Sequence, residues 1–247
     1  MGTRITSNDT LAPWYSKVVP PVTRGLEGWF TFDTDISRFG LNRAIGKQNG
    51  SVIGTPTAFP THGRFKGSLN YIQTPIKDSD EITLFAVVKA LVVPTSNADG
   101  VAAISTYNGT SVTPAVPGSS GGSSILLRGS SVVSAGIARS PGGVYNLELV
   151  NIVGGAPTAW RLLCVRGKSG VASEARDMTY NVSKLGTDLT TRVVNDKLFR
   201  IGSATTDYSG ESDISAAAIY SAYLTDDEIN LVAGAMRKRM LRLGISV

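Results

Sequence analysis

Two carboxylates stand two residues apart near the end of the chain, Glu211 and Asp213 in the segment Glu-Ser-Asp-Ile-Ser. Residues two apart in a β-strand point to the same face, and glycoside hydrolases place a pair of carboxylates around the bond that they cleave. The next residue on that face is Ser215 instead of another acid, and Glu148 stands alone in its own segment. We therefore expect Glu211 and Asp213 to face solvent at the end of a strand, and we expect no catalytic residues.

The other residue types that support chemistry are also isolated. The chain has one histidine, His62, and one cysteine, Cys164, so partners for a triad or a zinc site are missing. His62 is interpreted as an exposed turn residue, and Cys164, in an apolar segment, as a buried thiol. Asp33 and Asp35 leave a calcium site open, although the ligand spacing of an EF-hand is absent. No other cofactor or metal is predicted.

The net charge of the 247-residue chain is +5, which is a mild excess of basic residues. Part of the excess lies near the end of a predicted helix, at Arg237, Lys238, Arg239 and Arg242. Cations at that position complement the helix dipole, and aromatic residues do not alternate with them, so nucleic-acid binding is not expected. The longest apolar segment, 82–93, is too short to cross a bilayer, so no membrane insertion is expected.

The first 24 residues differ in composition from the rest. They lack the pattern of a secretory signal, and Pro20-Pro21 favours an extended path. We interpret residues 1–24 as an extended N-terminal arm or linker and residues 25–247 as one domain. The apolar residues of the arm are predicted to dock on this domain or on a partner, and they are Trp14, Tyr15, Val18 and Val19.

From Gly25 onward, short strand-like segments alternate with turns rich in glycine, proline and asparagine. Many short strands with this spacing are typical of an antiparallel sandwich or barrel. Part of the segment 82–93 is apolar on both faces, which suits a central strand that is covered on both sides.

The last segment, 225–243, is predicted to be an amphipathic helix. Thr225 and Glu228 form a capping box, and Gly244 is a natural stop. The apolar residues follow helical spacing at Ile229, Val232, Ala233, Met236, Met240 and Leu243. The helix is therefore expected to pack against the sandwich through one stripe.

Two sequence patterns stand at opposite ends of 25–247. The first is Gly-Leu-Glu-Gly-Trp-Phe-Thr-Phe-Asp, followed by a hairpin with glycine and apolar residues at Gly63, Phe65, Gly67, Leu69 and Tyr71. The second is Ile219-Tyr220, then Leu224-Thr225-x-x-Glu228-Ile229. Together they resemble the concanavalin A-like lectin/glucanase superfamily in its laminin-G-like branch. The resemblance implies an all-β fold, an antiparallel jelly-roll β-sandwich with one C-terminal helix, in which the first and last strands are neighbours.

The resemblance implies a fold and leaves the function open. Related glucanases use Glu-x-Asp-x-Glu on one strand, and Ser215 replaces the last acid here, so a glycoside hydrolase is the least favoured hypothesis. A lectin-like module that binds carbohydrate is the alternative. Tyr107 with Asn108, at a loop tip, is its candidate pair for glycan contact, whereas Trp29 and Trp160 are expected in the core.

The favoured hypothesis is a non-enzymatic structural or adhesion component of a bacteriophage virion, such as a tail fibre, baseplate or decoration protein. The apolar arm, the loops rich in serine, threonine and glycine, and the missing catalytic set resemble such proteins. They are synthesised in the host cytoplasm and assembled into virions, often as symmetric oligomers. The expected partners are other virion proteins, further copies of this chain and a host cell-surface glycan.

Overall fold

The computed structural model describes residues 20–129, 132–154 and 156–247. Within these ranges the strands form two large sheets. The first has the order β15-β14-β13-β6-β17-β4-β3, with β1 also pairing with β17. Its strands are β1 (Leu26–Thr31), β3 (Thr57–Ala58), β4 (Gly63–Lys66), β6 (Ile82–Ala90), β13 (Arg161–Lys168), β14 (Val171–Asp177), β15 (Val182–Leu185) and β17 (Glu211–Tyr220).

The second sheet has the order β12-β11-β10-β7-β16-β5-β2. Its strands are β2 (Ser51–Ile53), β5 (Tyr71–Lys77), β7 (Val101–Ser105), β10 (Ser123–Arg128), β11 (Val132–Arg139), β12 (Asn146–Val153) and β16 (Leu198–Ile201). A separate two-stranded ribbon consists of β8 (Gly109–Thr110) and β9 (Ser119–Ser120). The pairs are antiparallel in both large sheets, so the predicted all-β antiparallel sandwich is confirmed.

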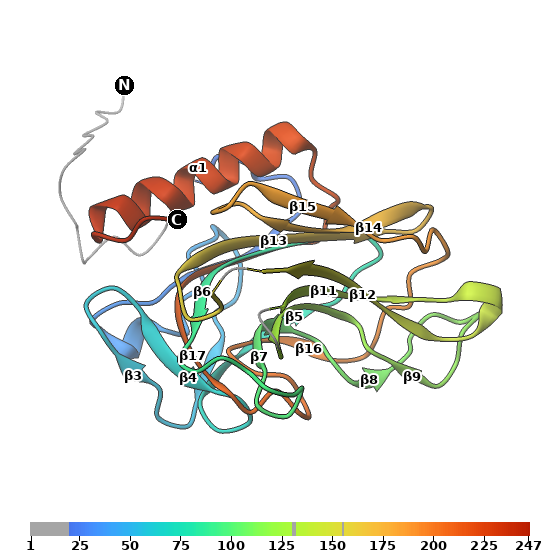
Figure 1. The fold of residues 1–247 in the computed structure, drawn as a ribbon, viewed down its shortest axis with the longest axis horizontal. Helices are drawn as coiled ribbons and strands as arrows, with labels where there is room; N and C mark the ends of the chain where they lie inside the picture. The colour runs from blue at the N-terminus through green and yellow to red at the C-terminus, as the bar shows by residue number, and fades with distance from the viewer. Residues whose placement is uncertain (1–19, 130–131, 155) are drawn as a thin grey trace.

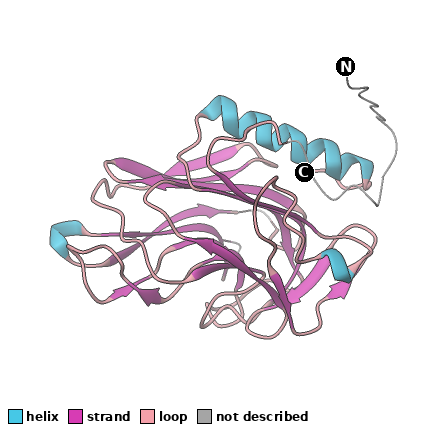
Figure 2. Ribbon diagram, turned by 180° about the vertical axis from the view of Figure 1, so that it is seen from behind, coloured by secondary structure: helices cyan, strands magenta, loops and turns pink. Residues whose placement is uncertain are grey.

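The two large sheets face each other, and α1 (Asp226–Arg242), the one α-helix in the described ranges, lies along the outer side of the first sheet (Figure 1). Apolar residues of both sheets fill the space between them, among them Leu84 and Val88 of β6 and Ile104 and Ile125 of the second sheet. The view from behind shows two short 3-10 helices, η1 (Ile36–Arg38) and η2 (Pro141–Gly143), in loops at opposite ends of the molecule (Figure 2).

The first and last strands are neighbours, as predicted. β1 pairs with β17 from Leu26 opposite Tyr220 to Thr31 opposite Ala216. On its other side β17 pairs with β6, the predicted central strand, which itself pairs with β13. The two motifs at the ends of the sequence therefore meet in the middle of one sheet.

Helix α1 begins and ends as its sequence predicts. The Thr225 hydroxyl accepts a hydrogen bond from the Glu228 amide, and the Glu228 carboxylate accepts one from the Thr225 amide at 2.8 Å. At the other end, Gly244 adopts a φ of 74°, and the amide of Ile245 donates to the Met240 carbonyl, which is a Schellman motif. Five residues of the predicted stripe are buried, Ile229, Val232, Ala233, Met236 and Met240, and Leu243 is half-buried.

The described part of the predicted arm contacts the domain. Val22 is buried in the cluster beneath α1, and Arg24 forms an ion pair of 2.6 Å with Glu228. Trp14, Tyr15, Val18 and Val19 lie outside the described residues, so their docking and the domain boundary remain predictions. In the described ranges, no helix has the length and apolar content needed to cross a bilayer.

Replacing Thr225 by alanine removes the hydroxyl that caps α1 and leaves the Glu228 amide without this acceptor. We expect the free energy of unfolding to fall by about 1 kcal/mol, measured by urea denaturation. Thr225→Ser, which keeps the hydroxyl, should stay close to wild type. Equal decreases in the free energy of unfolding for both variants would show that the methyl group of Thr225, and not the hydroxyl cap, contributes the stability.

Candidate functional site

The two acids of the Glu-Ser-Asp-Ile-Ser segment have different environments. Glu211 is exposed and lies 3.6 Å from the Lys66 ammonium, as a strand-end acid would. The Asp213 side chain is only 1% exposed, so the expectation that it faces solvent is wrong. The reason is the register of the sheet, because Asp213 lies between Arg64 on β4 and Lys89 on β6.

Cationic side chains surround the buried carboxylate of Asp213. The guanidinium of Arg64 donates hydrogen bonds of 2.8 and 3.2 Å to its two oxygens. The Lys89 ammonium lies 3.3 Å from one oxygen, and Nε2 of His62 lies 3.2 Å from the same oxygen. His62 was expected to be an exposed turn residue, which is wrong, since its side chain is 14% exposed. It lies just before β4 and therefore beside the acid on β17.

Two aromatic rings lie against these cations. The Arg64 guanidinium lies 4.8 Å from the centre of the Phe59 ring, and the Lys89 ammonium 5.2 Å from that of the Trp160 ring. His62 stacks on Phe59 with an interplanar angle of 13° and meets Trp160 edge-on. Trp160 was expected in the core, and the structure places it half-buried at the rim of the apolar cluster beneath α1; Trp29 is buried, as expected.

We call this group the Asp213 cluster, and it consists of Phe59, His62, Arg64, Lys89, Trp160 and Asp213. It lies on the outer face of the first sheet, the face that α1 covers further along. Val88, Phe65 and Ile214 point into the core between the sheets, so their neighbours Lys89, Arg64 and Asp213 point outward.

The charge of Asp213 is stabilised by its neighbours. Burial alone would raise the pKa of this carboxyl, but the nearby His62 ring and the hydrogen-bonded guanidinium of Arg64 hold it well below its usual range. The hydrogen bond between Arg64 and Asp213 also raises the pKa of the Arg64 guanidinium. Asp213 therefore stays ionised at neutral pH, and it acts as an anchor for cations and not as a proton donor.

The candidate pair Tyr107 and Asn108 lies elsewhere, in the loop after β7 of the second sheet. Tyr107 is half-buried, with its ring 5.5 Å from the ring of Tyr208 and nearly perpendicular to it. Asn108 is exposed, and its side-chain amide donates to the Thr206 hydroxyl at 3.3 Å. The structure does not bring this pair to the Asp213 cluster, and its role in glycan contact remains a prediction.

The two carboxylates considered for calcium point to different partners. Asp33 lies 3.2 Å from a guanidinium nitrogen of Arg239, and Asp35 caps η1 by accepting hydrogen bonds from Ser37. Across the described ranges, no three residues among His, Cys, Asp and Glu group together as metal ligands. Cys164 is buried as expected, and burial raises the pKa of its thiol.

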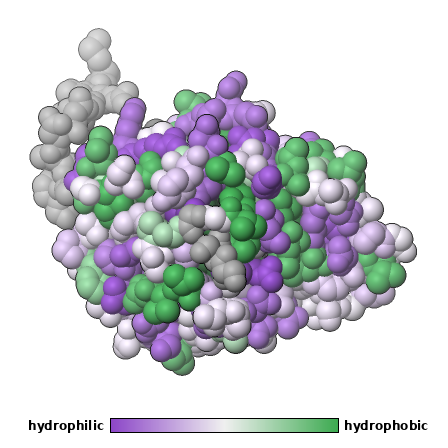
Figure 3. Space-filling view, viewed as in Figure 1, coloured by the Kyte–Doolittle hydropathy of each residue, from purple (hydrophilic) through white to green (hydrophobic). Residues whose placement is uncertain are grey.

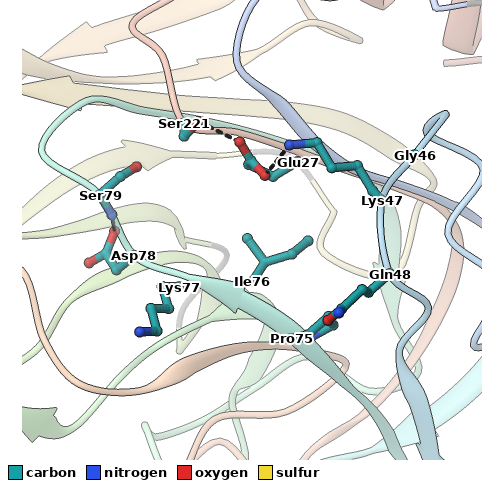
Figure 4. A pocket seen from close by; sticks show the side chains of 10 residues that line it. All are labelled: Glu27, Gly46, Lys47, Gln48, Pro75, Ile76, Lys77, Asp78, Ser79 and Ser221. Carbon is teal, nitrogen blue, oxygen red and sulfur yellow. Dashed lines mark hydrogen bonds and ion pairs between the residues drawn. The ribbon is translucent and has the colours of Figure 1, made fainter.

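A pocket of about 410 Å³ opens elsewhere, between the loop 46–48, the end of β5 and Ser221 (Figure 4). Three of its four charged side chains are already engaged, and the fourth, Lys77, is exposed. Glu27 forms an ion pair of 2.7 Å with Lys47 and accepts a hydrogen bond of 2.8 Å from Ser221. Asp78, another lining residue, accepts two hydrogen bonds of 3.0 Å from the buried Arg192. Because three of its charged groups are paired and its lining has no aromatic residue, the pocket is the weaker candidate for binding a sugar.

Apolar residues are also distributed over other surfaces. On the face seen in Figure 3 they form separate groups divided by polar residues. This mixture is ordinary for a protein surface and does not define a site.

A scan against protein-family models and a search of curated proteins found no match to this chain. Solved structures are similar in fold. The botulinum neurotoxin serotype D binding domain matches with a TM-score of 0.59 and 11% identity over 86% of this chain and 51% of that one. A structure of botulinum neurotoxin type C, described as dependent on two ganglioside molecules for cell entry, has a TM-score of 0.58 and 10% identity, with the same coverage.

Trypanosoma rangeli sialidase in complex with sialic acid also matches, with a TM-score of 0.58 and 13% identity over 89% of this chain and 35% of that one. The chain thus spans about half or less of the length of these proteins. The similarity is one of fold, and it agrees with the β-sandwich that the sequence resemblance implies.

Replacing Asp213 by asparagine leaves the cations around it without their carboxylate. We expect the free energy of unfolding at pH 7 to fall by about 1–3 kcal/mol, less than for a fully buried pair because Arg64 and Lys89 reach solvent. The pKa of Asp213 is lower in the folded state than in the unfolded state. The charge of Asp213 therefore contributes its full share of stability above the unfolded-state pKa of about 3.9, and this share is lost progressively as the pH falls below that value.

Urea denaturation of both proteins between pH 7 and pH 2.5 tests this expectation. The difference in the free energy of unfolding between wild type and Asp213→Asn should be constant above about pH 5 and shrink below about pH 4. A difference that does not depend on pH would mean that the charge of Asp213 contributes nothing to stability.

Proposed function

We propose that this protein is a non-enzymatic carbohydrate-binding module of the lectin-like β-sandwich type, and that the Asp213 cluster is its sugar-contacting surface. The observation that carries the proposal is the combination of a half-buried aromatic ring, Trp160, with charged hydrogen-bonding groups on one outer face. A sugar ring offers an apolar face for stacking and hydroxyls for hydrogen bonds, so it needs these two kinds of group side by side.

The sugars named for two of the similar structures agree with the ligand class that we propose. The similar structures include a domain whose description names ganglioside molecules and an enzyme bound to sialic acid. Identities of 10–13% support the fold alone, so the assignment to a particular surface rests on the geometry of the cluster.

A hydrolytic role is not proposed. Glycoside hydrolases need two carboxyl groups placed across the bond, one of which donates a proton. In the cluster the carboxylate of Asp213 is held ionised by Arg64 and His62, and Glu211 is exposed beside Lys66. The arrangement suits binding better than proton transfer.

We also propose a setting for this module, a bacteriophage virion, in which it acts as a structural or adhesion component. The arm 1–24 would attach it to other virion proteins, copies of the chain would form a homo-oligomer, and the sugar would belong to the host surface. The composition of the arm supports this proposal, and so does the way Val22 and Arg24 fix its end to the domain.

Replacing Trp160 by alanine should weaken sugar binding. On a glycan array we expect the wild type to bind a defined set of glycans, and Trp160→Ala to bind the same glycans about tenfold more weakly, because a stacking ring is lost. Tyr107→Ala is the matched control and should bind as wild type does. Thermal unfolding of each variant checks the fold, and Trp160→Phe, which keeps a ring, should retain part of the affinity.

The opposite pattern, with binding lost in Tyr107→Ala and kept in Trp160→Ala, would assign the sugar to the pair Tyr107 and Asn108. An array without any binding would contradict the proposed function.

Deleting residues 1–24 tests the virion setting. If the arm is the anchor, the shortened chain should no longer assemble into the particle of the parent phage, as detected in purified particles, while it keeps the glycan binding of the full chain. Unchanged incorporation would show that the arm does not attach the module.

A further inference from the structure

The charges of the Asp213 cluster do not balance. Arg64 and Lys89 carry permanent positive charges, and both contact the same carboxylate. The nearby pair of Lys66 and Glu211 is neutral as a unit. One positive charge is therefore left over at this surface before His62 is counted.

The excess charge is accessible from solvent. The Asp213 side chain is 1% exposed, whereas the side chains of Arg64 and Lys89 are 37% and 28% exposed. The carboxylate thus holds the cations from the inner side, and their outer sides face water. Its hydrogen bonds use Nε and Nη2 of Arg64, which leaves Nη1 outside this pairing.

The cations lie next to one half-buried ring, that of Trp160, over which Lys89 lies. The Phe59 ring is already covered by the Arg64 guanidinium and by the stacked ring of His62. A pyranose ring placed against Trp160 would bring a charged substituent towards the Lys89 ammonium. A second carboxylate there would give each of the two permanent cations an anionic partner, with the short charge-assisted hydrogen bonds that guanidinium and ammonium groups form.

We infer that this surface selects acidic glycans, and that Arg64 and Lys89 bind the carboxylate of the sugar while Trp160 contacts its ring. This inference rests on the proposed function and adds the class of ligand. The shared chemistry is a pyranose ring with a carboxylate, which a sialic acid and a uronic acid both provide.

Isothermal titration with matched pairs of probes tests the inference and separates the two sources. One pair is 3′-sialyllactose and its methyl ester, and the other is a hyaluronan tetrasaccharide and its carboxyl-reduced form. The full chain should bind the acidic member of at least one pair about tenfold or more tightly than the neutral member. Lys89→Gln should bind the acidic member about tenfold more weakly than wild type does and the neutral member equally well. Lys89→Arg should keep most of the affinity for the acidic member.

Lys184→Gln is the matched control, since Lys184 is an exposed lysine on β15 at the other edge of the same sheet. Equal losses for Lys184→Gln and Lys89→Gln would show a general effect of net charge and overturn the inference. Equal affinities for acidic and neutral members would overturn it and leave the proposed function intact. Binding of neutral glycans on the array without binding of any of these probes would have the same consequence. A protein that binds no glycan at all would overturn both the inference and the proposed function.

Discussion

The structure depends on a sheet whose central strands are apolar on both faces. In β6 the side chains of Leu84 and Val88 enter the core between the sheets, while Phe85 and Val87 enter the cluster beneath α1. Both faces need a cover, because each large apolar side chain left in water would forgo about 1.5–3 kcal/mol of stabilisation. The second sheet covers one face. The other needs a separate cover, and α1 provides it, which explains why a chain of short strands ends in one amphipathic helix.

The position of the Asp213 cluster follows from the length of that helix. Helix α1 runs back along β17, and its last turn reaches Ser215, whose hydroxyl accepts a hydrogen bond of 2.8 Å from Arg239. The register of β17 against β6 shifts between Ile214 and Ala216, a bulge that turns Ala216 towards the helix. Helix α1 does not extend past this bulge, and the next outward-facing residue of β17 is Asp213 instead of an alanine. Arg64 and Lys89 can occupy this part of the face because their side chains reach water, and they pair with the buried Asp213.

The fold could be predicted further than the site. The spacing of strands and turns, the capping box and the stop at Gly244 are signals made by residues close in sequence. The pairing of β1 with β17 was predicted from the family resemblance. The cluster joins residues on three strands and in two loops, and its register cannot be deduced from alternation in one segment. For this reason the local pattern predicts His62 as an exposed turn residue and Trp160 as core, whereas the two rings meet beside Asp213. The Lys89 within an otherwise apolar strand was the one available signal, because a cation there needs a partner in the sheet.

Fixing cations in advance is what distinguishes this surface from an ordinary patch of lysine and arginine. A flexible cation that binds an anion loses side-chain freedom, at a cost of about 0.5–1.5 kcal/mol for each immobilised side chain. Arg64 and Lys89 are already held, by Asp213 from within and by aromatic rings at their sides, so most of that cost falls in folding and not in binding. The buried acid then has a second consequence, because it withholds part of the positive charge from solvent and lowers the attraction for anions in general. In the proposed site, the remaining attraction would depend on a ligand that also contacts the Trp160 ring, which would favour a sugar acid over a free inorganic anion.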